Sequence, residues 1–354
     1  MIKAIISKVT IFLFGCLFAF IVGEIVLRGL GYAASDIYTQ GEAGLLILNP
    51  NEKIHIHSVC FQNDVQTNSL GFHSREYSFE RLEGVFRIAV IGDSFVEAMQ
   101  VPRDKTFTSF LEEKLNSLGN KSYKYEVMPF GISSHGTYRN IMYFEKYAAQ
   151  FKPDLVIDAL AWNDIEDDVY DSGIPVASGG FLKSAKKILR KSVLITTLRQ
   201  SYLTFRSKPE KDSDELSPTV EILLPEYDDF WQKAWIRQEE LLKNFKETAA
   251  MNNADFMVVS LTDGYRVHRD LLERFMAATQ SKTVDLEKPE KTLSVIAEKN
   301  SFPYLALNPL FKKRAAKEEG STVWPCDGHW NSLGHEWAAD ALVDYLVSQK
   351  LVGD

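Results

Sequence analysis

A short, mostly apolar run that ends abruptly in Gly92-Asp93-Ser94 is the feature that most constrains the fold. The run, residues 87–91, is rich in β-branched side chains, as is typical of a strand buried on both faces of a parallel sheet. A helical pattern follows at residues 107–118. This order of strand, tight turn and helix predicts that Ser94 lies at the carboxyl end of a strand, where open α/β sheets bind ligands. On these residues alone, Ser94 is either a nucleophile or a helix cap.

Alternating elements continue through the rest of the chain. Further strands are expected at 125–132, 153–160, 254–261 and 304–307. Helices are expected at 138–149, 230–252, 290–298 and 332–349, the last with Asn331 as its N-cap. Alternation of this kind predicts a parallel sheet covered by helices on both faces, with right-handed crossovers.

Composition limits the classes of function. The 354 residues are 45% hydrophobic and 25% charged, which is ordinary for a globular protein with a sizeable core. The net charge of −8 and the lack of a basic motif argue against nucleic acid as the main partner. Three cysteines are too few for a disulfide scaffold. Cys60 and Cys326 form either a disulfide or two unpaired thiols, and the sequence leaves both open.

An apolar stretch near the N-terminus predicts a membrane helix. Residues 9–22 carry no charge, and continued to residue 27 the stretch reaches about 19 residues, close to the ~20 that a spanning helix needs. Glu24 is tolerated because a charge near the interface costs far less than one at the centre. Lys3 and Lys8 favour a cytoplasmic N-terminus, which places the rest of the chain outside the cytoplasm.

A cleaved signal peptide is the alternative, because Gly31-Tyr32-Ala33 is a small-x-small cleavage pattern. That pattern lies well beyond the apolar stretch, with Glu24 and Arg28 in between, so we favour an uncleaved anchor. The chain is therefore expected to be a single-pass membrane protein whose main domain is periplasmic or otherwise extracytoplasmic.

Three parts are expected along the chain. Residues 1–34 form the cytoplasmic N-terminus and the anchor, 35–85 an irregular collar with short strands, and 86–350 the α/β domain. An insertion at about 165–228 interrupts this domain. It begins acidic and then becomes basic, with apolar residues between the charges at helical spacing. The insertion is either a helical lid on anionic lipid head groups or a solvated segment packed over the sheet.

Four segments that are far apart in sequence are expected to meet at one edge of the sheet. Ser94, Gly131 and Asn163 follow three predicted strands, and the Asp-Gly-His segment 327–329 precedes the last helix. The carboxyl ends of neighbouring parallel strands lie at the same edge. Acyl transfer needs such a set: a hydroxyl nucleophile, an imidazole base, a carboxylate to orient it, and hydrogen-bond donors for an oxyanion.

These segments resemble the four signature blocks of the SGNH (GDSL-type) hydrolases, in the same order and over about residues 86–349. The matching blocks are Gly92-Asp93-Ser94-Phe95, the Gly131 turn, Asn163-Asp164 and Asp327-x-His329. The apolar N-terminus, the middle insertion and Asn68-Ser69-Leu70-Gly71-Phe72 resemble the membrane-anchored bacterial branch. The resemblance implies a three-layer, flavodoxin-like α/β fold and an ester hydrolase or acyl-transferring enzyme.

The resemblance also implies a role for each matched residue. Ser94 would be the nucleophile, His329 the general base and Asp327 its partner. The oxyanion hole would be formed by Ser94, Gly131 and Asn163, and the structural residues at the site would be Asp93 and Asp164.

Three blocks depart from the family's pattern. The acid commonly lies three residues before the histidine, where this chain has Cys326, and Asp327 lies two before it, as in some bacterial branches. Ala161 stands where Gly is usual, and the bulk of the following Trp162 is expected to narrow the pocket. The second block has Pro129 where an Asn is common. None of these departures removes a required functional group.

Other histidines and acids have simpler interpretations. His55 and His57 share one face of a predicted strand, but without cysteine or acidic ligands nearby they are expected to be exposed strand residues rather than a metal pair. His335 is expected to be a surface or packing residue, Asp158 to brace a loop, and His135 either to line the pocket or to pack. The sequence has no metal cluster, phosphate loop or dinucleotide fingerprint, so no metal or cofactor is expected.

The leading hypothesis is a membrane-anchored serine esterase that deacylates, and specifically deacetylates, a carbohydrate or surface polysaccharide. One alternative is an O-acyltransferase to a polysaccharide hydroxyl, which shares the acyl-enzyme. The other is a non-catalytic polysaccharide-binding or assembly component that has kept the fold. Expected partners are an acylated small molecule or polysaccharide, membrane lipid around the N-terminal helix, and an envelope acyltransferase or polysaccharide machinery.

Overall fold

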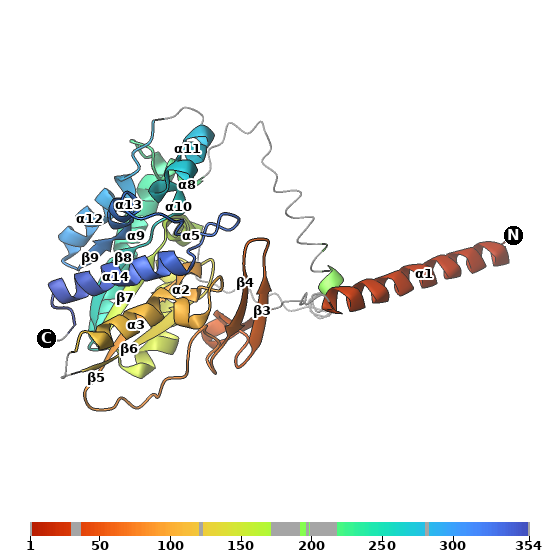
Figure 1. The fold of residues 1–354 in the computed structure, drawn as a ribbon, viewed down its shortest axis with the longest axis horizontal. Coiled ribbons are helices and arrows are strands. Elements are labelled where there is room, and N and C mark those ends of the chain that lie inside the picture. Colours follow the sequence, from red (N-terminus) through yellow and green to blue (C-terminus); the bar gives the residue numbers. More distant parts are fainter. Residues whose placement is uncertain are drawn as a thin grey trace. The chain divides into compact units, whose positions relative to one another are not determined.

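The computed structural model describes residues 2–29, 37–119, 123–170, 192–195, 198, 218–279 and 283–352 (Figure 1). The chain divides into two compact units. One consists of Met1–Thr39 with Val176–Asp214, and the other of Gln40–Pro175 with Glu215–Asp354. Most of the insertion expected at about 165–228 and the cleavage pattern at 31–33 lie outside the described residues.

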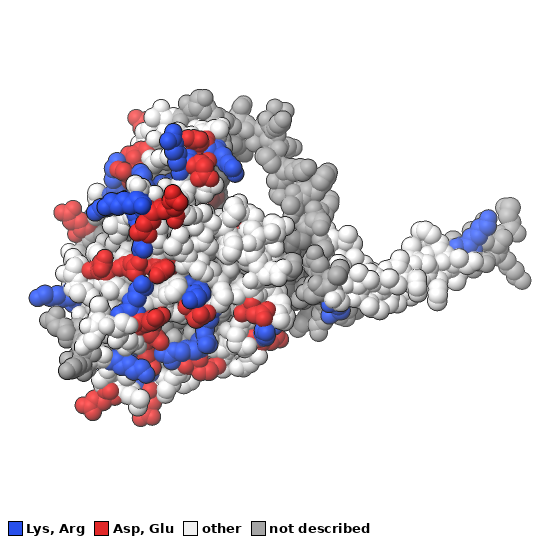
Figure 2. Space-filling view, viewed as in Figure 1, with Lys and Arg blue, Asp and Glu red and all other residues white. Residues whose placement is uncertain are grey.

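Helix α1 spans Ile2–Gly29 in the first unit. Within the described residues, Thr10–Gly29 is the one helical segment long and apolar enough to cross a membrane, and a signal sequence has the same properties. Its side chains are largely exposed and few are charged (Figure 2). Near its end, Glu24 accepts hydrogen bonds from the backbone N–H groups of Val193 and Leu194, both at 3.0 Å. These bonds compensate a carboxylate that apolar surroundings alone would disfavour.

A five-stranded parallel sheet forms the centre of the second unit. Its strands are β5 (Val85–Gly92), β6 (Lys124–Gly131), β7 (Leu155–Leu160), β8 (Asp255–Ser260) and β9 (Tyr304–Ala306). They lie in the order β6-β5-β7-β8-β9, and every neighbouring pair is parallel. In this flavodoxin-like order, β6 and β7 flank β5 on opposite sides, so the strand order reverses at β5, and open α/β sheets bind ligands at such a point, beyond the carboxyl ends of the strands.

Helices cover both faces of the sheet and complete three layers (Figure 1). On one face, α3 (Phe107–Ser117), α13 (Leu307–Ala315) and α14 (Ser332–Ser348) share an apolar core with the strands. The other face packs against α4 (Thr137–Tyr143), α5 (Trp162–Tyr170) and α9 (Asp229–Met251). Helix α12 (Lys288–Asn300) contacts β9. The three-layer α/β fold expected from the sequence is therefore confirmed.

Short helices are where the observed elements depart from the expected ones. The helix expected at 138–149 is α4 followed by a π-helical turn, Phe144–Ala148, and a 3-10 turn, Ala149–Phe151. The last strand ends at Ala306, and Leu307 already begins α13, which the sequence pattern did not predict. Further helices that were not predicted are α8 (Pro218–Glu221), α10 (Gly264–Val267) and α11 (Arg269–Ala278).

The collar segment consists of short antiparallel pairs and belongs to the same compact unit as the sheet from residue 40 on. Strands β1 (Tyr38–Gln40) and β2 (Leu46–Leu48) pair, as do β3 (Lys53–His57) and β4 (Gln62–Gln66). The turn 68–72 follows, in which the Asn68 carboxamide oxygen accepts hydrogen bonds from the N–H groups of Leu70 and Phe72.

Phe72 explains what this turn does. Its ring packs edge-on against three aromatic rings of the α/β part, those of Phe130, Tyr143 and Tyr147. Gly71 has a φ of +78°, and a Cβ there would lie 2.3 Å from the Leu48 carbonyl oxygen. The turn therefore needs its glycine, and it docks the collar onto the side of the sheet near β6.

Candidate active site

The turn after β5 presents the Ser94 hydroxyl because a neighbouring residue caps the helix. Helix α2 spans Ser94–Glu97, and its N-cap is Asp93, whose carboxylate accepts a 3.0 Å hydrogen bond from the N–H of Phe95. Ser94 is instead the first helical residue. Of the two roles that the sequence left open for Ser94, the helix cap is therefore wrong.

Two glycines let α2 lie directly on the strand ends. Gly92 pairs in register with Gly131 on one side and with Ala159 on the other. A Cβ on Gly92 would lie 2.7 Å from the Ala159 carbonyl oxygen, and one on Gly131 would lie 2.1 Å from the Glu97 nitrogen. Any side chain at either position would displace α2, and with it the Ser94 hydroxyl.

Ser94 meets residues from the other end of the chain. The Nε2 atom of His329 lies 2.7 Å from the Ser94 Oγ, and its Nδ1 lies 3.0 Å from Oδ2 of Asp327. Hydroxyl, imidazole and carboxylate thus form one continuous hydrogen-bonded chain. Both distances are within the range at which an imidazole takes a proton from a hydroxyl while a carboxylate fixes its tautomer.

The loop that carries Asp327 and His329 is held by its own backbone. The N–H of Trp324 donates to the His329 carbonyl oxygen at 2.9 Å, and the N–H of Gly328 donates back to the Trp324 carbonyl oxygen at 2.8 Å. Gly328 has a φ of +84°, a conformation that favours glycine. The imidazole packs on Phe95, with ring centroids 5.0 Å apart. This loop therefore presents His329 in one orientation.

Neighbouring carboxylates set the charge state of the imidazole. Burial alone would lower the pKa of His329, but the hydrogen bond and charge of Asp327 outweigh burial and raise that pKa above its ordinary value. The carboxylates of Asp93 and Glu97 act in the same direction. Burial raises the pKa of Asp93 itself, and this effect outweighs the hydrogen bond from the N–H of Phe95, which acts to lower that pKa. The site therefore favours the imidazolium that a general base becomes after taking a proton.

The two other expected oxyanion residues lie at neighbouring strand ends. Gly131 is the last residue of β6, and Asn163 is the second residue of α5, directly after β7. The Asn163 amide donates to Asp164 at 3.3 Å and to Asp167 at 3.4 Å. The register of β5 with β6 and β7 brings these residues to the edge that Ser94 occupies. Their donation to an oxyanion stays a prediction.

Asp164 has the bracing contact expected of a structural residue. It is fully buried and accepts a 3.0 Å hydrogen bond from the N–H of Ala161, across the turn from β7 to α5. Burial, followed by the nearby charges of Asp93 and Asp168, raises its pKa well above the ordinary value. Protonation of this carboxyl is consequently favoured in the folded protein.

Two further buried carboxyls brace the start of α4. Asp158 on β7 accepts hydrogen bonds from the Asn140 amide at 2.9 Å and the Thr137 hydroxyl at 3.3 Å. Asp168 accepts from the N–H groups of Thr137 and Tyr138, both at 2.9 Å. Burial raises the pKa of each to about 7. The sequence analysis gave Asp158 this kind of role and missed Asp168, which is one of several acids in a row on α5.

Glu97 is a site neighbour that the sequence analysis missed. It is buried on α2, and its carboxylate accepts hydrogen bonds from the N–H and hydroxyl of Ser133, in the loop after β6. Its carbonyl oxygen is bonded to the buried ring of His73, at 3.1 Å. Glu97 thus ties α2 to the collar and to the loop beyond Gly131. No local sequence signal marks a helical glutamate for this role.

The remaining histidines have structural contacts. His55 Nδ1 lies 2.5 Å from Asp64 on the paired strand of its hairpin. His135 is buried and lies against the ring of Tyr143, 3.3 Å from its hydroxyl. His335 accepts a hydrogen bond from the N–H of Phe107, and burial lowers its pKa to about 3, so it is a packing residue. Among the described residues no group of three or more His, Cys, Asp or Glu could hold a metal ion.

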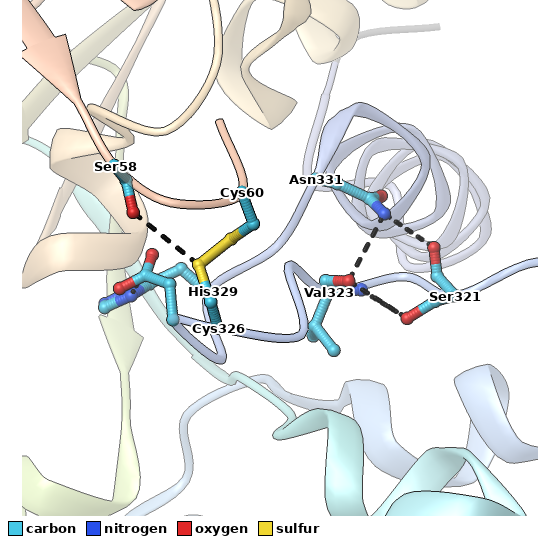
Figure 3. The surroundings of a disulfide bond; sticks show 8 residues. Ser58, Cys60, Ser321, Val323, Cys326, His329 and Asn331 are labelled. Atoms are coloured by element: carbon cyan, nitrogen blue, oxygen red, sulfur yellow. Dashed lines mark hydrogen bonds and ion pairs between the residues drawn. A yellow bond between two sulfur atoms is a disulfide. The ribbon is translucent and has the colours of Figure 1, made fainter. Parts of the chain in front are cut away.

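A disulfide joins the collar to the loop that carries Asp327 and His329 (Figure 3). Cys60, at the tip of the β3–β4 hairpin, is bonded to Cys326, which directly precedes Asp327. Next to this bond, the rings of Phe61 and Trp324 lie 5.6 Å apart. Of the two alternatives that the sequence left open, the structure has the disulfide, and the collar thereby helps to place Asp327 and His329.

Comparisons with known proteins give similarity at the level of solved structures. No protein-family model matches the chain, and no curated protein does. An acetyl xylan esterase matches with 13% identity and a TM-score of 0.43, over 73% of this chain and 98% of the other. A mutant of the acetylxylan esterase Axe2 from Geobacillus stearothermophilus matches with 12% identity and a TM-score of 0.43, over 75% and 96%. A lipase/acylhydrolase from Enterococcus faecalis matches with 11% identity and a TM-score of 0.40, over 75% and 96%.

The structure itself brings together all four blocks of the SGNH resemblance. Ser94, Gly131 and Asn163 lie at three adjacent strand ends, and His329 reaches the Ser94 hydroxyl from the last loop. The chain therefore has the fold and the motif arrangement that the resemblance implies. What the site can do chemically follows from the geometry of Ser94, His329 and Asp327.

Removing the disulfide is expected to lower both stability and turnover. The bond closes a loop with a sequence separation of 266, and native disulfides of this kind stabilise by about 2–5 kcal/mol. The Cys60→Ser/Cys326→Ser variant should lose about that free energy of unfolding, measured by denaturant titration. Any turnover of 4-nitrophenyl acetate by the native protein should also fall in the variant, because Asp327 and His329 are less well placed. Adding a reductant should affect the native protein but not the variant. Equal stability and turnover in both proteins would contradict this role.

The Asp158→Asn variant is expected to gain stability relative to the native protein as the pH rises. The folded pKa of Asp158 is about 7, whereas an unfolded aspartate titrates at about 4. The folded protein is therefore stabilised by the proton on the Asp158 carboxyl. This contribution is complete below about pH 4 and is lost as the pH rises through about 7. The difference in thermal midpoint, variant minus native, should therefore increase over this range, measured by circular dichroism.

Comparing the thermal midpoints of the variant and the native protein removes the opposing pH dependence that two buried histidines contribute. Burial lowers the pKa of His73 to about 4 and that of His335 to about 3, and both are common to the two proteins. An Asp104→Asn variant is the control, because the Asp104 side chain is exposed. A difference for Asp158→Asn that is as flat with pH as that of the control would count against the buried, protonated carboxyl.

Proposed function

We propose that this protein is a serine ester hydrolase that acts through an acyl-enzyme on Ser94. The observation that carries the proposal is the chain of contacts from the Ser94 hydroxyl to His329, at 2.7 Å, and from His329 to Asp327, at 3.0 Å. A hydroxyl, an imidazole and a carboxylate in this order are the functional groups that nucleophilic acyl transfer requires.

In the proposed reaction the imidazole of His329 acts first as a base and then as an acid, both when the acyl-enzyme forms and when it is hydrolysed. His329 takes the proton of Ser94 as the hydroxyl oxygen attacks the ester carbonyl carbon, and Asp327 stabilises the imidazolium that forms. His329 then gives the proton to the leaving alcohol, and the acyl group stays on Ser94. The oxygen of a water molecule then attacks the acyl carbon while His329 takes a proton from that water. The bond from this carbon to the Ser94 oxygen breaks, His329 returns the proton to Ser94, and the acid leaves. The oxyanion donors in this proposal are the N–H groups of Ser94 and Gly131 and the amide of Asn163.

The proposed substrate is an acetyl ester of a carbohydrate or surface polysaccharide. A cavity of about 520 Å³ opens beside His329 and Asp327. Aromatic rings line it, including those of Tyr265, Phe275 and Trp324. Flat aromatic faces with a few polar groups suit the apolar face and hydroxyl-bearing rim of a sugar ring, which supports a carbohydrate as the alcohol half of the ester.

The proposed location is outside the cytoplasm, on a single N-terminal membrane anchor. The apolar segment Thr10–Gly29 is long enough to serve as this anchor, and Lys3 and Lys8 precede it. The Cys60–Cys326 disulfide supports the same location, because such bonds persist in oxidising compartments and are rare in the cytosol.

Labelling with a serine-reactive phosphonate tests the proposed nucleophile. The full-length protein in detergent is expected to be labelled on Ser94 and to hydrolyse 4-nitrophenyl acetate, and Ser94→Ala should abolish labelling and lower turnover by at least about 10³-fold. Ser117→Ala is the matched control, because Ser117 is an exposed serine on α3. A native protein that is neither labelled nor active would instead indicate the non-catalytic component. Mass spectrometry of acetylated glycan products with and without a hydroxyl acceptor separates hydrolysis from O-acyl transfer.

The pH dependence of turnover tests the role of Asp327. Since His329 acts as a base when neutral, turnover is expected to fall as the pH drops through the raised pKa of His329. Asp327→Asn removes the main interaction that raises this pKa, so the acid limb should move to lower pH and kcat should fall by up to about 10⁴-fold. Steady-state kinetics over a pH series measures both changes. An acid limb that does not move would refute Asp327 as the partner of His329.

A further inference from the structure

The position of the cavity beside the imidazole of His329 indicates which half of a bound ester it would hold. Its walls include Asp327, Gly328 and His329, whereas neither Gly131 nor Asn163 is among its lining residues. It therefore lies on the side of the imidazole rather than beside Gly131 and Asn163. In ester cleavage the alcohol oxygen receives its proton from the imidazole, so the alcohol half lies on the imidazole side. On the proposed function, this cavity is consequently the place for the alcohol half.

One wall of the cavity is aromatic and comes from short helices that the sequence did not reveal. The rings of Tyr265 on α10 and Phe275 on α11 stack with their centroids 4.3 Å apart. The side chain of Trp324 completes this wall from the catalytic loop. Because the two stacked rings hold one another in place, they give the cavity a rigid, uncharged aromatic wall, which suits the apolar part of a cyclic ligand.

Of the charged side chains that line the cavity, two are compensated within the protein. Asp263 lies 3.4 Å from the guanidinium of Arg266, a buried side chain that also binds Glu290 at 2.7 Å. Asp327 is bonded to His329. Neither acid is therefore a strong, uncompensated charge facing the cavity.

Arg274 differs from these groups. It lines the same cavity from α11, its side chain is exposed, and within the described part of the chain it forms no ion pair. Arg269, on the same helix, is paired with Glu273 at 3.1 Å and does not line the cavity. A planar guanidinium without a partner, at the edge of an aromatic wall, is suited to a carboxylate.

We propose that Arg274 determines specificity by binding a carboxylate on the alcohol half of the ester, so that the cavity takes an acidic sugar residue. The sugar ring lies against the wall formed by Tyr265, Phe275 and Trp324, and its carboxylate pairs with the guanidinium. An ester hydroxyl on that ring faces Ser94 and His329. This inference rests on the proposed function for its orientation, but the cavity binds the sugar whether or not a reaction follows.

Calorimetric binding to the full-length protein in detergent tests this proposal without depending on turnover. The probes are a galacturonic acid trisaccharide and its methyl-esterified form, which differ in charge but share the same rings. The acidic trisaccharide is expected to bind about fivefold more tightly at low salt, since a partly exposed ion pair contributes up to about a factor of five. Arg274→Gln should remove this preference, and Arg274→Lys should keep part of it. Raising the salt concentration should reduce it.

Arg269→Gln is the matched control and should keep the full preference, since Arg269 carries the same charge on the same helix outside the cavity. The acidic trisaccharide should also inhibit hydrolysis of 4-nitrophenyl acetate competitively, which places it beside Ser94. Equal binding of the two probes to the native protein, or a preference that survives Arg274→Gln, would overturn the proposal. Failure of the proposed function is seen separately, as absent phosphonate labelling of Ser94 with the binding preference intact.

Discussion

The contact of helix α2 with the carboxyl ends of β5 and β6 is the constraint on which the rest of the site depends. Gly92 and Gly131 leave no room for a Cβ, so the helix rests on backbone atoms of the sheet. Backbone contacts vary little, and α2 begins at Ser94, so the position of the Ser94 hydroxyl is fixed by the sheet itself. Sites built on such rigid elements hold their geometry better than sites carried by loops alone.

The acids around this contact divide into two groups. Asp327 and Glu97 act on the imidazole of His329 through their charge, and both have hydrogen-bonded partners. Asp158 and Asp164 are fully buried behind the sheet edge, and burial raises the pKa of each. At the same sheet edge, against the effect of its burial, the hydrogen bond to His329 thus lowers the pKa of Asp327, whereas burial raises the pKa of the two bracing carboxyls.

The sequence predicted the sheet well because long apolar runs leave few alternatives. Strands such as β5 and β7 are buried on both faces, so their residues are almost uniformly apolar, and a Gly or polar turn marks each end. Helices α10 and α11 were missed because they are short and follow one another closely, and a short amphipathic pattern cannot be told from a loop. The cavity wall that they provide was therefore missed as well.

The residues proposed for catalysis show a similar division. Ser94 and His329 were predicted from motifs, since each lies in a short run of residues that can be recognised from the sequence alone. The N-cap role of Asp93 and the ties made by Glu97 depend on the orientation of single side chains, which a linear sequence does not contain. Pairing of Cys60 with Cys326 depends on a distance between two loops that only the complete fold defines.

The position of that disulfide along the chain has a consequence for how the protein matures. Cys60 is made early, and its partner follows only after 266 further positions, next to Asp327. The bond can close only when nearly the entire polypeptide has been synthesised and the last loop has docked against the hairpin. Covalent completion of the loop that carries Asp327 and His329 therefore needs both the finished chain and an oxidising environment, and a chain kept among cellular reductants lacks this link to the hairpin.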